Sequence, residues 1–205
     1  MNVGIILAAG KSSRFNSLTP KQLYLIDGKP VINYSIDVLS QYLDEIIIIS
    51  NSDCFDKIKT NSKILINDVD NRIESIKRSL DYLNNDWDNI LIHDAARPFI
   101  NSDMILKLLK SQKENSHSQY YLPIVNGLAQ NSNGHWEIPN RNDFIQLCSP
   151  QITDFKLFKS IFKNHIETGL ECEILPVVSR SGLKFNLIEG NYRDLRKVTT
   201  LEDLL

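Results

Sequence analysis

The chain contains few cysteine, proline and glycine residues and no excess of basic residues, and these low counts argue against several classes of protein. Its 205 residues include 3 cysteines, 7 prolines and 8 glycines, and its 23 Lys and Arg residues do not outnumber its 25 Asp and Glu residues. A nucleic-acid-binding protein needs a basic surplus to neutralise the phosphate backbone, so the charge balance argues against nucleic acid as a main partner. The small share of proline and glycine, with 42% hydrophobic residues, excludes disorder and collagen-like repeats and indicates an ordinary globular chain.

The cysteines and the apolar runs exclude two further classes. Cys54, Cys148 and Cys172 are odd in number and form no CxxC pair, so neither a disulfide framework nor a structural zinc site has support. Apolar stretches of about six residues are far shorter than the roughly 20 that cross a bilayer. The N-terminal residues also contain no cationic leader. We therefore expect a soluble cytoplasmic protein with reduced cysteines and no membrane partner.

In the first half of the chain, β-branched runs alternate with amphipathic stretches, which is typical of βα units around a parallel sheet. The pattern predicts strands at 3–7, 45–50, 63–67 and 89–93 and helices at 31–43, 71–83 and from Ser102, whose hydroxyl is the expected cap. Later segments predict a strand at 120–125, a helix at 154–164 and a strand at 184–188. The predicted fold class is α/β, and no linker divides residues 1–205 into two domains.

Residues 126–142 break this alternation. The segment is polar and rich in Asn and Gly, with a short apolar core at Trp136 and Ile138. It is too long and too turn-rich for a standard connection, so it predicts a β-arm that leaves the sheet. Because the arm has too little apolar surface to fold alone, we expect Trp136 and Ile138 to bury against a second subunit. The alternative is a solvated loop.

Two loops follow predicted strands, and ligands of open α/β sheets collect at the carboxyl ends of strands. The first loop contains Ala8, Ala9 and Gly10, small residues that let a backbone approach a base or a phosphate closely. Arg14 and Lys21 bring cations to the same region. The loop is therefore a candidate nucleotide site, and a βα turn with solvated charges is the alternative.

A resemblance of this loop to the phosphate-binding P-loop does not hold. Five residues separate Gly4 from Gly10, where that motif requires four. The P-loop lysine and serine must also open a helix, and Pro20 would soon interrupt a helix that began at Lys11 and Ser12. A P-loop kinase is therefore the weakest of the candidate functions.

The second loop directly follows a strongly apolar strand and contains His93, Asp94 and Arg97. Asp94 could hold a metal or a substrate hydroxyl, and Arg97 could bind a phosphate or pair with Asp94. Taken alone, the two residues fit a structural ion pair as well as a site. We interpret His93 as a strand-end histidine with its hydrogen bonds satisfied rather than as a base.

Six segments, in order along nearly the whole chain, carry a resemblance to a known family. They are Leu7-Ala8-Ala9-Gly10 through Arg14; Pro20-Lys21-Gln22 with Gly28-Lys29-Pro30-Val31; Asp70-Asn71-Arg72-Ile73-Glu74-Ser75; His93-Asp94-Ala95-Ala96-Arg97-Pro98; Ile138-Pro139-Asn140-Arg141 with Pro150-Gln151; and Glu189-Gly190 with Lys197-Val198-Thr199-Thr200 and Glu202-Asp203-Leu204. Together they resemble the cytidylyltransferases that act on 2-C-methyl-D-erythritol 4-phosphate or on ribitol 5-phosphate.

The resemblance implies a Rossmann-like nucleotidyltransferase domain with a mostly parallel sheet, paired into a homodimer through the arm. It also implies transfer of a cytidylyl group from CTP to an alditol phosphate, with Mg²⁺ at the site. Its implied residue roles are catalysis by Arg14, Lys21, Arg141 and Lys197; nucleotide binding by Ala8, Ala9, Gly10, Asp70 and Ser75; acceptor binding by Asp94, Arg97, Arg141, Ser149 and Lys197; and metal binding by Asp94. Arg141 would act in the partner subunit's site. A phosphate acceptor with a second pKa near about 6 is already ionised at neutral pH, so this chemistry needs cations rather than a base.

The chain also departs from the family's pattern. Ser12 stands where a second glycine is usual, and Asp68-Val69 stands where a Gly-Gly pair is common, so Val69 could narrow the approach to the base. Further departures are Asn126-Gly127 to Ala129, Cys172-Glu173 and one extra residue between Gly190 and Lys197. They leave open the identity of the acceptor, the use of another nucleotide, and a nucleotide-binding dimer without turnover.

Overall fold

A seven-stranded sheet forms the centre of the molecule. The computed structural model describes the chain apart from residues 16, 70, 84–86, 166–173 and 205. The strands lie in the order β11-β7-β10-β6-β1-β4-β5. Their bounds are β1 Asn2–Leu7, β4 Glu45–Ser50, β5 Lys63–Ile66, β6 Asn89–Asp94, β7 His117–Pro123, β10 Ile145–Asp154 and β11 Phe185–Glu189. Neighbouring strands are parallel except that β10 runs antiparallel to β6 and β7, which confirms the mostly parallel sheet.

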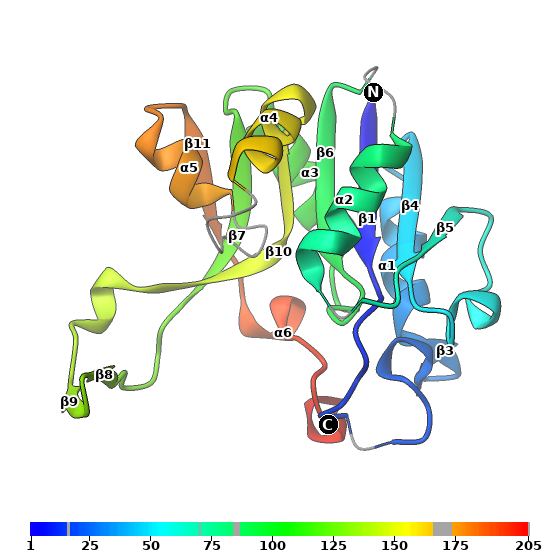
Figure 1. Ribbon diagram of the computed structural model, residues 1–205, viewed down its shortest axis with the longest axis horizontal. Coiled ribbons are helices and arrows are strands. Elements are labelled where there is room, and N and C mark those ends of the chain that lie inside the picture. Colours follow the sequence, from blue (N-terminus) through cyan, green and yellow to red (C-terminus); the bar gives the residue numbers. More distant parts are fainter. Residues whose placement is uncertain (16, 70, 84–86, 166–173, 205) are drawn as a thin grey trace.

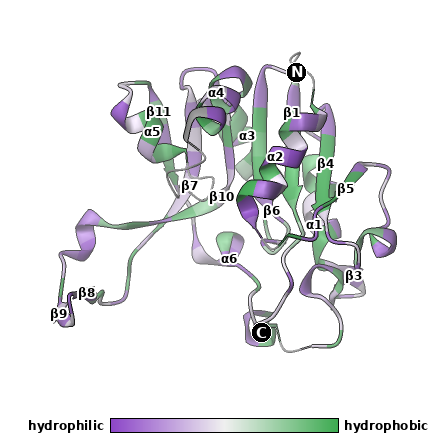
Figure 2. Cartoon of the chain, in the orientation of Figure 1, coloured by the Kyte–Doolittle hydropathy of each residue, from purple (hydrophilic) through white to green (hydrophobic). Residues whose placement is uncertain are grey.

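Helices cover both faces of this sheet (Figure 1). They are α1 Val31–Leu39, α2 Arg72–Tyr82, α3 Ser102–Gln112, α4 Phe155–His165, α5 Leu175–Arg180 and α6 Tyr192–Leu195. One core cluster packs α1 and α3 against strand residues such as Ile6 and Ile48, and the other packs α2, α4 and α5 against their neighbours Ile5 and Ile47. Because both faces are buried, β4 is apolar from Ile46 to Ile49, and Figure 2 shows the hydrophobic colour along it.

Short elements complete the chain. The strands β2 Leu25–Ile26 and β3 Lys29–Pro30 pair with each other beside α1. Single 3₁₀ turns lie at Lys21–Leu23, Phe55–Lys57, Arg141–Asp143 and Leu201–Leu204. Within the described part of the chain, none of the helices has the length and the apolar character needed to cross a bilayer.

One predicted helix cap and one predicted helix end were wrong. The cap of α3 is Asn101, whose side chain accepts a hydrogen bond from the Met104 amide at 3.1 Å, and Ser102 is the first helical residue. The predicted start of the helix at Ser102 is confirmed, and its cap was misassigned because asparagine caps a helix as well as serine does. α1 ends at Leu39 instead of continuing to 43, and the Leu43 amide still bonds to the Leu39 carbonyl at 3.1 Å.

Strand β10 was not predicted. Pro150 lies inside it, and a proline argues against a strand because it cannot donate a ladder hydrogen bond. The structure accommodates the proline through a shift in register between Cys148 and Gln151 in the pairing with β7. Cys148 and Cys54 are buried and free, as the sequence predicts, whereas Cys172 lies outside the described residues.

The arm connects β7 to β10 and leaves the sheet, as Figure 1 shows at the end opposite β5. Its tip is a hairpin of β8 Gln130–Ser132 and β9 His135–Glu137. Asn133 and Gly134 form its two-residue turn with φ of 53° and 88°, the left-handed backbone that an Asn-Gly hairpin turn requires. The protruding β-arm is confirmed, and its pairing with a second subunit stays a prediction.

Candidate active site

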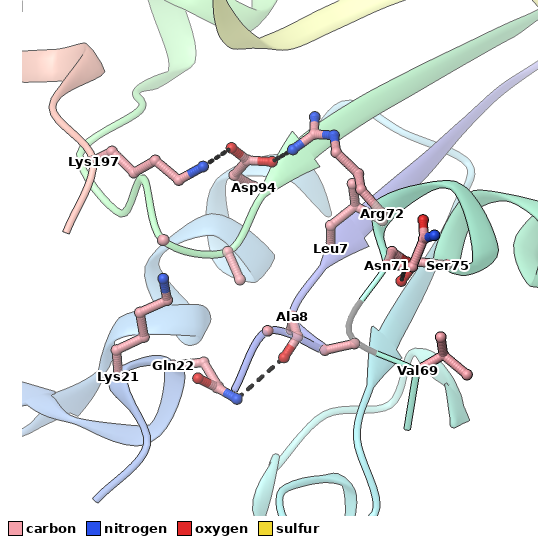
Figure 3. Close-up of a pocket in the computed structure, with 14 residues that line it drawn as sticks. Leu7, Ala8, Lys21, Gln22, Val69, Asn71, Arg72, Ser75, Asp94 and Lys197 are labelled. Carbon is pink, nitrogen blue, oxygen red and sulfur yellow. Dashed lines mark hydrogen bonds and ion pairs between the residues drawn. The ribbon is translucent and has the colours of Figure 1, made fainter. Parts of the chain in front are cut away.

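A pocket lies at the carboxyl ends of β1 and β6, where the parallel sheet brings separate loops together (Figure 3). Fourteen residues line it: Leu7, Ala8, Ala9, Gly10, Lys21, Gln22, Val69, Asn71, Arg72, Ser75, Asp94, Ala95, Ala96 and Lys197. Of the predicted site residues, the pocket therefore unites Ala8, Ala9, Gly10, Lys21, Ser75, Asp94 and Lys197. Predicted Asp70 lies outside the described residues.

The first wall of the pocket is the loop after β1. The Ala8 amide donates to the Ile49 carbonyl at 2.8 Å, which extends the pairing of β1 with β4 by one bond. Ala8 and Ala9 are buried, and Gly10 is exposed. A Cβ atom at Gly10 would meet nothing within 4 Å, so the space beside this backbone is open to a ligand.

Gln22 ties this loop to the 3₁₀ turn that carries Lys21. The Gln22 side chain is 2% exposed, and its amide nitrogen donates to the Ala8 carbonyl at 3.1 Å and to the Cys54 thiol at 3.2 Å. Lys21 begins the turn and lines the pocket. The position of Lys21 is therefore coupled to the end of β1.

The second wall is the start of α2. Asn71 caps this helix by accepting a hydrogen bond from the Ile73 amide at 2.8 Å. Buried Asn67 holds the preceding loop: its side chain accepts from the Val69 amide at 3.2 Å and donates to the Val69 carbonyl at 3.1 Å and to the Ser75 hydroxyl at 2.9 Å. Val69 lines the pocket, at the position where the sequence predicts a narrower approach to a base.

An ion cluster forms the floor. The Asp94 carboxylate pairs with the Arg72 guanidinium through one oxygen and with the Lys197 ammonium, 2.8 Å away, through the other. Figure 3 shows the two cations on opposite sides of Asp94. Burial acts to raise the pKa of the Asp94 carboxyl, but the charges of Arg72 and Lys197 outweigh it and hold that pKa far below its usual range. Asp94 is therefore ionised at any physiological pH and holds both cations at the pocket.

Two predicted residues support this floor from outside the lining. The Ser149 hydroxyl accepts a hydrogen bond from the Asp94 amide at 3.0 Å. Arg97 is buried, donates to the Leu195 carbonyl, and has its Nε atom 3.9 Å from the Asp94 carboxylate. The structure thus gives Arg97 the ion pair that was the alternative interpretation, and the acceptor roles of Arg97 and Ser149 stay predictions.

His93 is fully buried beneath the same loop. Its Nε2 atom lies 3.1 Å from the Ser35 hydroxyl and 3.1 Å from the Arg97 carbonyl. Burial lowers the pKa of His93 to about 4, so the imidazole is neutral at pH 7. The prediction of a strand-end histidine with its hydrogen bonds satisfied is therefore confirmed for Nε2 only, because the buried Nδ1 atom has no hydrogen-bond partner in the described part of the chain.

The remaining predicted cations lie apart from the pocket lining. Arg14 is exposed in a turn closed by the Phe15 amide, which donates to the Ser12 carbonyl at 2.9 Å. Arg141 lies on the arm, where its guanidinium donates to the Val125 carbonyl at 3.0 Å. The chain therefore does not bring Arg141 to its own pocket, and the proposed roles of both arginines remain to be tested.

Arg72, Gln22 and Asn71 are pocket residues to which the sequence analysis assigned no role. Each lies in a segment that carries the family resemblance, so the segments indicated the region but not the side chains. The signal for Arg72 is its place as the first residue of α2, one turn before Ser75. Its pairing with Asp94 depends on the sheet order, which puts β6 beside β1.

Among the lining residues that the structure describes, Asp94 is the one acidic side chain. In the described part of the chain, no group of three or more His, Cys, Asp or Glu side chains could hold a metal ion. Magnesium at nucleotide sites uses one or two protein carboxylates and completes its shell with phosphates and water. The donor set therefore fits an ion that binds together with a nucleotide, and does not fit one held by the protein alone.

Comparison with known proteins decides the family. The family model for 2-C-methyl-D-erythritol 4-phosphate cytidylyltransferase matches residues 2–205. The chain belongs to this family. The 2-C-methyl-D-erythritol 4-phosphate cytidylyltransferase of Thermosipho africanus is 31% identical to it over 216 residues, which cover 100% of this chain and 95% of the relative. As a family member the chain is a cytidylyltransferase, an enzyme that transfers a nucleotidyl group.

Solved structures show the same fold. The 4-diphosphocytidyl-2C-methyl-D-erythritol synthase of Anaerococcus prevotii superposes with a TM-score of 0.81 at 22% identity and covers 100% of this chain and 94% of that one. The bifunctional IspDF of Campylobacter jejuni superposes with a TM-score of 0.81 at 24% identity. The match covers 99% of this chain and 53% of IspDF, so the chain spans about half the length of that protein. These likenesses confirm the α/β nucleotidyltransferase fold.

Proposed function

We propose that this cytidylyltransferase transfers the cytidylyl group of CTP to the phosphate of 2-C-methyl-D-erythritol 4-phosphate and releases pyrophosphate. The observation that carries the proposal is the pocket at the ends of β1 and β6, where Lys21, Arg72 and Lys197 meet in a chain that belongs to the family. Three cations around one pocket suit a reaction between two anions, because each must be brought to the other against their repulsion.

The nucleotide binds along the first two walls in this proposal. The exposed backbone at Gly10 and the small side chains of Ala8 and Ala9 allow the cytidine to lie close to the loop after β1. Ser75 and the loop at Val69 face the base, held by Asn67. This placement directs the triphosphate toward Lys21 and toward the turn that carries Arg14.

The reaction needs no general base. An oxygen of the ionised acceptor phosphate attacks the α-phosphorus of CTP, a new phosphorus–oxygen bond forms, and the bond to the β-phosphate breaks with the electron pair leaving on pyrophosphate. Negative charge concentrates at the α-phosphate during this step, so Lys21 and Arg14 stabilise the transition state and Lys197 positions the acceptor phosphate. Asp94 keeps Arg72 and Lys197 in place before the substrates arrive, which reduces the reorganisation needed.

A Mg²⁺ ion bound with the nucleotide would be held by Asp94 and the substrate phosphates and would supply further neutralisation of phosphate charge. The Lys197 ammonium lies 2.8 Å from the Asp94 carboxylate, so the residue that would hold the metal also adjoins the residue proposed to position the acceptor. The enzyme's own cations remain responsible for orienting the two reacting groups.

Residues 1–205 act as one domain in this proposal, with residues 126–142 as the dimerisation arm. Trp136 and Ile138 are 70% and 86% exposed in the single chain, which supports burial of the arm against a second subunit. Arg141 does not line its own chain's pocket and donates to the Val125 carbonyl, and it would then complete the acceptor site of the partner subunit. The buried free thiols and the nucleotide substrate support a cytoplasmic location.

Pyrophosphate release tests the assignment. The four ribonucleoside triphosphates are combined in turn with 2-C-methyl-D-erythritol 4-phosphate, ribitol 5-phosphate and other alditol phosphates in the presence of Mg²⁺. We expect turnover with CTP and 2-C-methyl-D-erythritol 4-phosphate to exceed every other pair. Preference for another nucleotide would overturn the assignment of CTP, and preference for ribitol 5-phosphate would reassign the acceptor. Nucleotide binding without turnover would identify a non-catalytic protein.

A further inference from the structure

Ser12 has a backbone conformation that suits glycine. Its φ is 57°, in the left-handed region that a non-glycine residue rarely occupies. Serine lacks the freedom of glycine at such a φ, so its presence here calls for a compensating interaction. Backbone strain of this kind is retained where the surroundings enforce it, and it is found most often at functional sites.

The compensating interactions are hydrogen bonds of the Ser12 hydroxyl. Its Oγ atom donates to the side-chain carbonyl of Gln22 at 3.1 Å and accepts from the backbone amide of Lys21 at 3.2 Å. Gln22 in turn donates to the Ala8 carbonyl at the end of β1. A continuous chain of hydrogen bonds therefore runs from the sheet, through Gln22 and Ser12, to the backbone of Lys21.

The backbone of Ser12 supports the other catalytic cation of the proposed mechanism. Its carbonyl accepts the hydrogen bond from the Phe15 amide that closes the turn containing Arg14. Phe15 is buried and packs edge-on against Tyr24, with ring centroids 5.2 Å apart. One residue thus connects the segment of Arg14 to the segment of Lys21.

We propose that Ser12 is a positioning residue whose hydroxyl holds Lys21 at the pocket for cytidylyl transfer. The inference rests on the proposed catalytic role of Lys21. A glycine at position 12 would adopt the same φ without strain, but it would remove one hydrogen-bond partner from Lys21 and one from Gln22. Ser12→Gly therefore separates the two roles: it relieves the backbone and withdraws the hydroxyl.

The test is a double-mutant cycle on the full chain with CTP and 2-C-methyl-D-erythritol 4-phosphate. We expect Ser12→Gly to lower kcat by about 5- to 20-fold with a smaller change in KM, since a displaced catalytic group costs rate even when binding persists. Lys21→Ala should lower kcat by about 10²-fold, and adding Ser12→Gly to it should change kcat little further. The melting temperature of Ser12→Gly should equal or exceed that of the unmodified enzyme.

Matched variants complete the design. Ser13→Ala removes the hydroxyl of the adjacent exposed serine and should leave kcat unchanged. Ser12→Asn tolerates the left-handed backbone and offers an oxygen acceptor, so it should retain more turnover than Ser12→Gly. Unchanged kcat in Ser12→Gly, or effects of Ser12→Gly and Lys21→Ala that multiply, would overturn the proposal. Near-normal turnover in Lys21→Ala would instead show that the catalytic assignment of Lys21 is wrong, and the role of Ser12 with it.

Discussion

In the pocket, charged side chains of one chain pair with one another: the buried Asp94 carboxylate lies between half-buried Arg72 and exposed Lys197. In the arm, Trp136 and Ile138 face solvent at 70% and 86% exposure. A polar cluster that satisfies its own charges can form before any ligand binds, whereas exposed apolar side chains on a thin hairpin gain stability only from another surface. The pocket is therefore formed by the side chains of one chain, whereas the arm needs a second surface to bury its apolar side chains.

The largest effect should come from the pocket. Lys21→Ala should lower kcat by about 10² or more, because loss of one preorganised charge at a transition state costs roughly 3 kcal/mol. The melting temperature should stay close to that of the unmodified enzyme, since Lys21 is a partly exposed residue. Steady-state kinetics and thermal melting check both expectations. Lys11→Ala, at an exposed lysine of the neighbouring loop, is the control, and equal losses in the two variants would contradict a specific role for Lys21.

Substitutions in the arm should change the oligomeric state of the enzyme. Replacing Trp136 and Ile138 together by serine removes apolar surface that is mostly exposed in the single chain, so the fold of the monomer should persist. Sedimentation should show a shift from dimer to monomer, with turnover lost in parallel because Arg141 no longer reaches a second site. Tyr192→Ser, at an exposed aromatic residue outside the arm, should change neither property. A variant that stays dimeric would show that the arm is not the main interface.

Low pH should reduce the stability of the folded domain, because two histidines are buried in it. Burial lowers the pKa values of His93 and His117 to about 4, so the unfolded chain takes up protons between about pH 6.5 and pH 4 that the folded chain does not. The free energy of unfolding should fall over this range by up to about 3 kcal/mol for each histidine. Urea unfolding at several pH values measures the fall. His117→Asn should flatten it, His135→Asn in the exposed arm should not, and identical slopes would contradict the assignment.

The smallest effect concerns ligand stabilisation. CTP with Mg²⁺ at about 100 times its dissociation constant should stabilise the folded enzyme by about 2.7 kcal/mol, which raises the melting temperature by several degrees. 2-C-methyl-D-erythritol 4-phosphate alone should raise it less, because its proposed site is completed by the partner's arm. Differential scanning fluorimetry makes the comparison. Greater stabilisation by GTP than by CTP would overturn the base assignment.

Strands and helices with a clear pattern of hydrophobic residues could be predicted from the sequence. The strands around Ile5, Ile48 and Ile92 were found because consecutive apolar residues are typical of strands covered on both faces. β10 was missed because Pro150 sits inside it, and the proline is tolerated only through a register shift that no local pattern reveals. The start of α3 was predicted correctly at Ser102, but its cap was misassigned because Asn101 and Ser102 are both good caps.

The site could be predicted as a region more readily than as a set of contacts. Small residues and cations after the first predicted strand indicated Lys21, and the carboxylate at the end of a later strand indicated Asp94, because strand ends of a parallel sheet converge. The pairing of Asp94 with Lys197 joins residues 103 positions apart, and that with Arg72 depends on the order of the strands. Such contacts follow from tertiary packing, which residue patterns alone do not specify.

Subunit mixing tests the central comparison most directly. Lys21→Ala and Arg141→Ala, each nearly inactive alone, are combined under conditions in which subunits exchange, and exchange is verified with a mass-tagged chain. If the pocket of one chain is completed by Arg141 of the other, a heterodimer carries both lesions in one site and leaves its second site intact. Activity should then return to about a quarter of that of the unmodified enzyme, since half the dimers are mixed and half of their sites are intact. Verified exchange with no return of activity would contradict an arm that acts in the partner subunit's site.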